Sequence, residues 1–267
     1  MSKWDQLAAP NHWPVRSIDE IRSHIICSRR PAKQCIVFVH GFNGEAIQTW
    51  DGFNADALKD PALAETDLIF FGYDGLNSNA LAASSFLFDL LDSVMSDGAL
   101  IGRQSPPATA YASCVLAGHS LGALVTRWAL IRAYEQKLPW LDKIRYILFA
   151  PAHSGGIIVD SVTELLGSNP ISKFLGNLAK AKIPLLQELR QGSPMLKCLE
   201  DKTKAALTAG CTSLRPRRVL IAEFELIVSN IPFPGDPYPT AIRKAEHTTV
   251  CKLSQFPQIL AYVKELL

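Results

Sequence analysis

The sequence of 267 residues lacks the features that mark disulfide-rich, metal-binding and membrane-spanning proteins. Its six cysteines form no C-x-x-C pair, and its histidines and cysteines do not have the spacing of a zinc site. No apolar run approaches the roughly 20 residues that cross a bilayer. The N-terminal stretch also lacks the apolar segment of a secretory signal. These absences predict a reduced, soluble, cytoplasmic protein without a metal or a transmembrane segment.

The low net charge and the absence of two glycine-rich motifs exclude further classes of protein. The formal net charge is only +2, and the basic run at residues 215–218 is too short to indicate binding to nucleic acid. No G-x-G-x-x-G follows a strand-like run, and no G-x-x-x-x-G-K is present, so no nucleotide cofactor is expected. Hydrophobic residues make up 48% and charged residues 19%, which is typical of a globular chain.

Short apolar runs alternate with helix-like patterns along the chain. Runs rich in β-branched and aromatic residues predict buried strands at residues 35–39, 67–73, 112–118, 144–150 and 217–224. Between them, apolar residues recur at helical spacing, as at residues 87–95. Strands that alternate with helices predict a mainly parallel sheet with helices on both faces. We therefore expect an α/β fold in which residues 1–267 form a single domain.

One serine lies between two glycines, just after a predicted strand. The sequence GHSLG at residues 118–122 fits G-x-S-x-G, and an amphipathic helical pattern follows it. Between a strand and a helix, the glycines of this motif permit a sharp turn that projects the serine from the strand's carboxyl end. Ser120 is therefore the candidate nucleophile.

A serine nucleophile needs hydrogen-bond donors for the negative oxygen that forms on the carbonyl group. The run VFVHGFNG (residues 37–44) reads as a strand followed by a His-Gly turn. The backbone N–H of Phe42 would then point into the site beside that of Leu121, which follows the nucleophile. His40 is interpreted as a histidine that anchors this turn.

The base must be a histidine whose loop reaches the nucleophile. His247 lies just before the C-terminal helical pattern, which is where a chain ordered serine, acid, histidine has its base. His153, in a loop after a predicted strand, is the alternative base. His119 is adjacent to the nucleophile, and its side chain is expected to point away from it.

The acid should follow the strand at residues 217–224. Glu225 stands at the expected end of this strand and is the first candidate. Glu223, two residues earlier, and Asp236, in the loop FPGDPYP, are the alternative acids. The sequence alone leaves this choice open.

About sixty residues separate two of the predicted strands, far more than a βα connection needs. Residues 155–214 contain apolar clusters interrupted by proline and glycine. We expect them to form a helical cap insertion over Ser120 that selects apolar acyl groups.

The runs VFVHGFNG, GHSLGALVTR, APAHSGG and EHTTVCK together resemble the α/β-hydrolase superfamily, most closely its lipase-like branch. That branch includes triacylglycerol lipases and GPI-inositol deacylases, and the resemblance covers about residues 35–267. It implies an α/β-hydrolase fold and a triad of Ser120, His247 and an acid, with an oxyanion hole from Phe42 and Leu121. The family's usual Gly-x-x-Asp after the penultimate strand is absent here, and Glu225 takes its place by analogy.

The function expected from these residues is that of a serine ester hydrolase of the esterase or lipase type, acting without a cofactor through an acyl-enzyme. Its substrate would be a small-molecule or lipid ester with an apolar acyl group. That substrate would place the chain in lipid metabolism and leave peripheral contact with a membrane open. The same nucleophile also fits an acyltransferase or a peptidase. A different class is a catalytically silent α/β-hydrolase fold that serves as a binding module.

Overall fold

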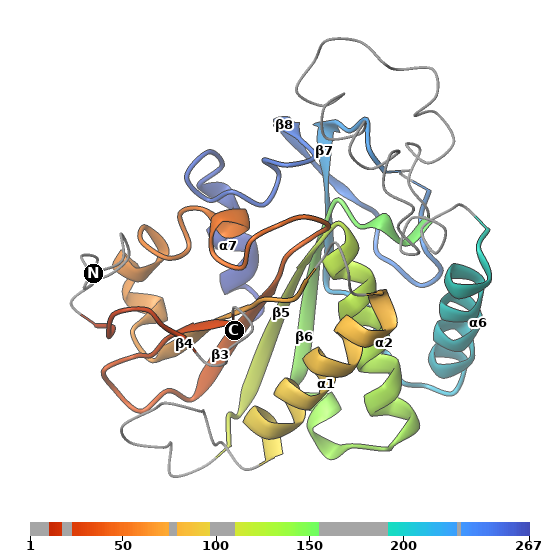
Figure 1. The fold of residues 1–267 in the computed structure, drawn as a ribbon, viewed down its shortest axis with the longest axis horizontal. Helices are drawn as coiled ribbons and strands as arrows, with labels where there is room; N and C mark the ends of the chain where they lie inside the picture. The colour runs from red at the N-terminus through yellow and green to blue at the C-terminus, as the bar shows by residue number, and fades with distance from the viewer. Residues whose placement is uncertain (1–10, 18–22, 75–78, 97–109, 155–191, 229–230) are drawn as a thin grey trace.

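The computed structural model describes residues 11–17, 23–74, 79–96, 110–154, 192–228 and 231–267. These residues form one sheet with the strand order β1-β2-β4-β3-β5-β6-β7-β8 (Figure 1). The strands are β1 (Arg16–Ser17), β2 (His24–Ile26), β3 (Gln34–Val39), β4 (Thr66–Phe71), β5 (Ser113–His119), β6 (Ile144–Phe149), β7 (Arg218–Phe224) and β8 (Thr240–Glu246). Strands β3 to β8 run parallel, and the short strands β1 and β2 add an antiparallel edge.

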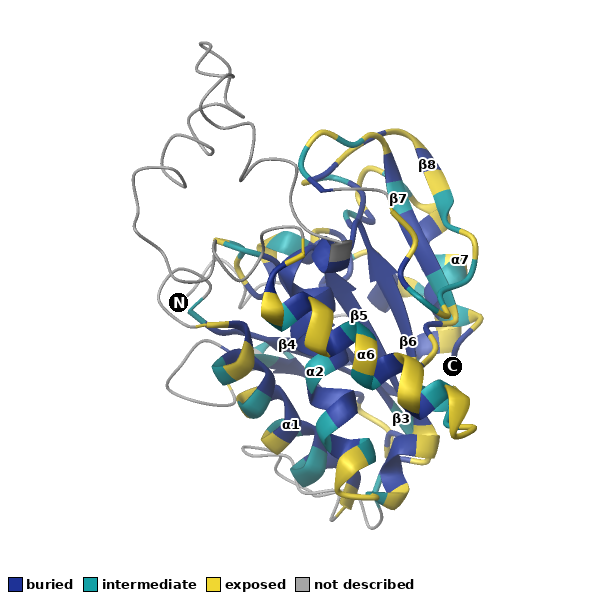
Figure 2. Cartoon of the chain, turned by 90° about the vertical axis from the view of Figure 1, so that its right-hand side faces the viewer, coloured by how far each residue is buried: buried dark blue, intermediate teal, exposed yellow. Residues whose placement is uncertain are grey.

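Helices cover both faces of this sheet. Figures 1 and 2 show α1, α2 and α6 on one face and α7 on the other. The α-helices described are α1 (Ala80–Ser96), α2 (Leu121–Glu135), α6 (Pro194–Thr208) and α7 (Gln258–Lys264). The 3₁₀ turns are η1 (Gln48–Trp50), η2 (Ala57–Lys59), η3 (Pro61–Leu63), η4 (Pro139–Lys143), η5 (Ala152–Ser154) and η6 (Thr212–Leu214).

The predicted strands are confirmed within two residues at each end, as β3, β4, β5, β6 and β7. Strand β8 was not predicted, because only three of the seven residues of TAIRKAE are apolar and they do not alternate with the polar ones. Of its seven residues, Ile242 and Ala245 are buried, as expected for a strand at the edge of a sheet. The two antiparallel strands β1 and β2 were also missed. They have two and three residues, too few for a periodic pattern.

The core lies on both faces of the central strands. Every residue of β4, and all but the first residue of β3 and β5, is buried. Cys35 and Cys114 are paired in register across β3 and β5 and are fully buried, as expected for cysteines that act as small apolar residues. Helix α2 is buried over most of its surface because α1, α6 and β5 all pack against it.

The predicted cap insertion is described only in part. Residues 192–214 contain α6 and η6, and α6 packs against α2, where the Trp128 indole N–H donates to the Met195 sulfur over 3.1 Å. Residues 155–191 lie outside the described part of the chain, so the cap over Ser120 stays a prediction. Within the part that is described, no helix is both long and apolar enough to cross a membrane.

Candidate active site

Three polar side chains follow directly after three strands of the parallel sheet. Ser120 follows β5, Glu225 follows β7 and His247 follows β8. Because these strands are parallel, their carboxyl ends lie at the same edge of the sheet, where α/β sheets bind ligands. Phe224 and Glu246 are paired in register across β7 and β8, so the residues after them emerge side by side.

The backbone at Ser120 has a conformation that side chains rarely adopt. Its φ is 53° and its ψ is −119°, at the point where β5 turns into α2. Glycines permit this turn. At Gly118, an added Cβ would lie 3.0 Å from the Ala123 Cα, and at Gly122 it would lie 2.2 Å from the Val39 carbonyl oxygen. The predicted sharp turn is therefore present, with Ser120 at its apex.

The side chains of Ser120, His247 and Glu225 form a continuous chain of hydrogen bonds. The Ser120 Oγ lies 2.9 Å from the His247 Nε2, and the His247 Nδ1 lies 3.0 Å from both oxygens of Glu225. A carboxylate can only accept, so Nδ1 carries the proton and Nε2 is left to accept the serine O–H. This is the tautomer that a histidine needs in order to act as a base toward serine.

The Glu225 carboxylate is held in place by the backbone as well as by His247. Its side chain is only 1% exposed, and Oε1 accepts the N–H groups of Ile227 and Val228 over 2.8 and 3.1 Å. A buried carboxylate needs such donors to offset the loss of water. The two backbone bonds therefore fix its orientation toward the imidazole.

The turn after β3 packs against the first turn of α2. An added Cβ at Gly122 would meet the carbonyl oxygens of Val39 and His40, and one at Gly41 would lie 2.9 Å from the Ser120 Cβ. This packing brings the segment that contains Phe42 beside Ser120. Leu121 is the first residue of α2, so its N–H has no acceptor within the helix. Their role as oxyanion donors stays a proposal.

The alternative acids and the alternative base have other contacts. Glu223 is exposed, and its carboxylate accepts the backbone N–H of Lys244. Asp236 binds Arg127 through both oxygens, at 2.5 and 2.7 Å. The His153 Nε2 lies 3.9 Å from the Asp236 carboxylate, and the His153 ring packs on Phe233. Of the three candidate acids, it is Glu225 that lies beside His247. Of the two candidate bases, it is His247 that lies beside Ser120.

Comparison with known proteins supports the architecture. No family model matches the sequence, and no curated protein matches it. Many solved structures share its fold. A mature lipase of Bacillus licheniformis superposes with a TM-score of 0.59 at 17% identity, over 92% of this chain and 96% of that one. A type II thioesterase of the yersiniabactin biosynthetic pathway gives 0.50 at 17% identity, over 89% and 96%. An esterase of Pyrococcus furiosus gives 0.50 at 11%, over 96% and 90%.

The chain has the α/β-hydrolase fold. The parallel strands, the sharp turn after β5 and these superpositions agree on it. This confirms the fold class predicted from the sequence. Among the residues described, no group of three or more His, Cys, Asp or Glu side chains could hold a metal ion.

His119 contributes to this candidate site in a way that the sequence analysis missed. Its ring lies 5.0 Å from the His247 ring, and its Nε2 donates to the His247 carbonyl oxygen over 2.8 Å. Its Nδ1 is buried without a hydrogen-bond partner. Burial, together with the nearby His247, lowers the pKa of His119 to about 3, so the ring is neutral. His119 therefore anchors the loop that carries His247.

A buried ion pair anchors the loop between β7 and β8, which begins at Glu225. Arg127, two turns along α2 from Ser120, binds Asp236 in that loop, and the two side chains are 2% and 3% exposed. The guanidinium also stacks on the Phe233 ring at 4.2 Å, and its Nη1 lies 3.4 Å from the Tyr146 hydroxyl. The helix that presents Ser120 is thus tied to the loop that presents Glu225.

Removing one partner of this ion pair should destabilise the fold strongly. Arg127→Met or Asp236→Leu leaves one buried charge uncompensated, and we expect each to lower the free energy of unfolding by about 3–5 kcal/mol. The double variant removes both charges. Its free energy of unfolding should therefore fall by much less than the sum of the decreases in the two single variants. Urea unfolding of the four proteins measures this coupling. Additive losses would show that the two groups do not stabilise each other.

Stability should decrease in acid because of His119 and His153. Burial lowers the pKa of His119 to about 3 and, with Arg127 nearby, lowers that of His153 well below its ordinary value of 6.5. Below pH 6.5 the unfolded chain therefore binds more protons than the folded one. Each group then removes up to about 1.4 kcal/mol of stability per pH unit. Urea unfolding at a series of pH values from 7 downward measures the free energy of unfolding. This free energy should fall less steeply with decreasing pH in His119→Gln than in the parent, and an equally steep fall would contradict this explanation.

Proposed function

We propose that this protein is a serine hydrolase that cleaves carboxylic esters through an acyl-enzyme. The observation that carries the proposal is the hydrogen-bonded series from the Ser120 Oγ through the His247 imidazole to the Glu225 carboxylate, at 2.9 and 3.0 Å. A serine hydroxyl is a weak nucleophile unless an adjacent base takes its proton. The contact between the His247 imidazole and Ser120, with the Glu225 carboxylate behind the imidazole, supports this role for His247.

In the first half of the reaction, the Ser120 Oγ attacks the ester carbonyl carbon while the His247 Nε2 takes the hydroxyl proton. The negative carbonyl oxygen is stabilised by the backbone N–H groups of Leu121 and Phe42 and by the amino end of α2. The bond to the leaving oxygen then breaks, and His247 returns its proton to the departing alcohol.

In the second half, water attacks the acyl group on Ser120. His247 takes a proton from the water as the new bond forms, and it gives that proton to the Ser120 Oγ as the carboxylic acid leaves. Glu225 stays ionised throughout. It holds the imidazole in one tautomer and stabilises its charged form.

The choice of esters as the proposed substrates rests on the names of the solved structures that share this fold. The similar structures are named as a lipase, a thioesterase and an esterase, and each name denotes cleavage of an acyl group from an alcohol or a thiol. The expected preference for apolar acyl groups rests on clusters of apolar residues between positions 157 and 178. These residues lie outside the described part of the chain, so the preference rests on sequence alone.

Ser120→Ala should remove ester turnover and labelling by a fluorophosphonate probe. Loss of a triad nucleophile costs on the order of a million-fold in kcat. The assay follows release of p-nitrophenol from esters of graded chain length, with circular dichroism as the check on folding. Ser85→Ala, on the outer helix α1, is the matched control and should keep the parent's activity. An unlabelled parent would favour a catalytically silent fold, and an active Ser120→Ala would exclude this nucleophile.

Glu225→Gln should lower kcat by about three to four orders of magnitude with little change in KM, because the amide no longer stabilises the charged imidazole. Glu223→Gln is the matched control, since it lies two residues earlier and is exposed. It should stay within a few-fold of the parent. Steady-state kinetics of these two variants and of Asp236→Asn identifies which carboxylate is the acid of the proposed triad. Full activity of Glu225→Gln, together with a large loss of kcat in Glu223→Gln or Asp236→Asn, would assign the role of the acid to that other residue.

A further inference from the structure

The His119 ring lies between the segments that form the candidate site. His119 is the last residue of β5, next to Ser120, and it is 6% exposed. On one side, its Nε2 donates to the His247 carbonyl oxygen over 2.8 Å, and the two rings lie 5.0 Å apart. On another side it meets the turn after β3, where a Cβ added at Gly41 would lie 3.1 Å from the His119 Nδ1. One side chain thus contacts both segments that converge on Ser120.

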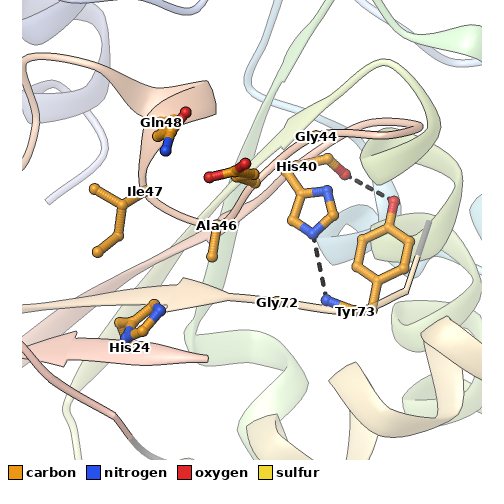
Figure 3. Close-up of a pocket in the computed structure, with 9 residues that line it drawn as sticks. His24, His40, Gly44, Ala46, Ile47, Gln48, Gly72 and Tyr73 are labelled. Carbon is orange, nitrogen blue, oxygen red and sulfur yellow. Dashed lines mark hydrogen bonds between the residues drawn. The ribbon is translucent and has the colours of Figure 1, made fainter. Parts of the chain in front are cut away.

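The turn after β3 gives the His119 ring a fixed neighbour. The His40 Nδ1 donates to the Gly41 carbonyl oxygen over 2.8 Å, and its Nε2 accepts the Tyr73 backbone N–H over 3.3 Å. The Tyr73 hydroxyl donates to the His40 carbonyl oxygen over 2.8 Å, and the two rings stack at 4.3 Å (Figure 3). These contacts agree with the interpretation of His40 as the histidine that anchors this turn. The Trp50 ring then packs edge-on against His119 at 6.5 Å.

The surroundings of His119 fix its hydrogen-bonding state. A carbonyl oxygen can only accept, so the Nε2 carries the proton. The Nδ1 is buried and has no hydrogen-bond partner among the described residues. Because burial lowers its pKa to about 3, the ring is neutral. It therefore gives the His247 segment one directed hydrogen bond, without a positive charge beside the imidazolium that the proposed reaction forms.

The position of His247 has to satisfy two distances at once. Its Nε2 lies 2.9 Å from the Ser120 Oγ while its Nδ1 lies 3.0 Å from the Glu225 oxygens. Strands β6 and β7 separate β8 from β5 in the sheet, so no pair of neighbouring strands sets the distance from His247 to Ser120. The hydrogen bond from His119 joins these two strand ends directly. In a reacting geometry, a displacement of about 1 Å can cost on the order of a hundred-fold in rate.

We propose that His119 is a positioning residue: its hydrogen bond to the His247 carbonyl oxygen holds the His247 imidazole within reach of Ser120. This inference rests on the proposed hydrolase function. It adds to that function a side chain that touches neither the substrate nor the reacting atoms and that acts only through His247.

The test compares two substitutions at position 119 that differ in one hydrogen bond. His119→Gln keeps an N–H donor that reaches about as far as the Nε2, and His119→Leu fills a similar volume without a donor. Labelling by the fluorophosphonate is followed over a range of probe concentrations, which separates the maximal rate constant from the half-saturating concentration. We expect His119→Leu to lower the rate constant about ten- to a hundred-fold with an unchanged half-saturating concentration. His119→Gln should stay within a few-fold of the parent.

His12→Leu is the matched control. His12 is also fully buried, its Nε2 donates to the Thr66 carbonyl oxygen over 3.1 Å, and its Nδ1 also has no partner among the described residues. Thr66 begins β4, so this bond lies at the edge of the sheet opposite Ser120. The control should lower the stability to urea, as His119→Leu does, but leave the labelling rate unchanged. His119→Asn, whose amide is too short to reach the carbonyl oxygen, replaces His119→Leu if circular dichroism shows that variant to be unfolded.

A second measurement does not depend on catalysis. In protein with isotope-labelled histidine, NMR detects the Nδ1 proton that His247 shares with Glu225, and the loss of its signal in Glu225→Gln identifies it. The signal should persist in His119→Gln and shift or broaden in His119→Leu.

Three results would overturn the proposal. These are a labelling rate of His119→Leu equal to the parent's, equal losses in His119→Leu and His119→Gln, and an equal loss in His12→Leu. Failure of the hydrolase function looks different. In that case the parent itself is not labelled, while the NMR signal still shows whether His119 positions the His247 imidazole.

Discussion

The geometry of the site depends on the close approach of the first turn of α2 to the end of β3. At Gly122 the two segments are so close that a single added carbon would overlap the Val39 carbonyl oxygen. At this contact the chain passes from β5 into α2 with Ser120 at a positive φ. Such a conformation costs of order 1–3 kcal/mol, and it persists because the packing around it allows nothing else. The same contact brings the turn that contains Phe42 to Ser120.

The other two members of the candidate triad are positioned by buried polar contacts. His119 holds the loop after β8 through the His247 carbonyl oxygen, and Arg127 holds the loop after β7 through Asp236. Buried polar groups are costly unless they are paired. Here each contact joins elements that are far apart in the sequence, across 128 and 109 residues. We interpret them as contacts that fix the relative positions of the three strand ends.

Much of the site could be predicted because its signals are local. The glycines around Ser120 indicate a sharp turn, since the flanking runs read as a strand and a helix. Glu225 could be placed at the end of β7 because an apolar run ends there. The edge strand β8 escaped prediction, since its apolar residues are few. His119 and Arg127 were missed for another reason: nothing next to them in the sequence indicates which distant carbonyl or carboxylate they contact.

The sequence by itself determined the five strands β3 to β7 and the identity of the candidate nucleophile, because apolar periodicity and glycine positions act on the chain within a few residues. It also narrowed the acid to three carboxylates and the base to two histidines. Only the tertiary structure shows which of these side chains come together. Glu225 and His247 meet because β7 and β8 are neighbours that end at the same edge, whereas Asp236 is drawn to Arg127 on α2. Pairings of this kind depend on which strands lie side by side, and strand order is a property of the packed sheet.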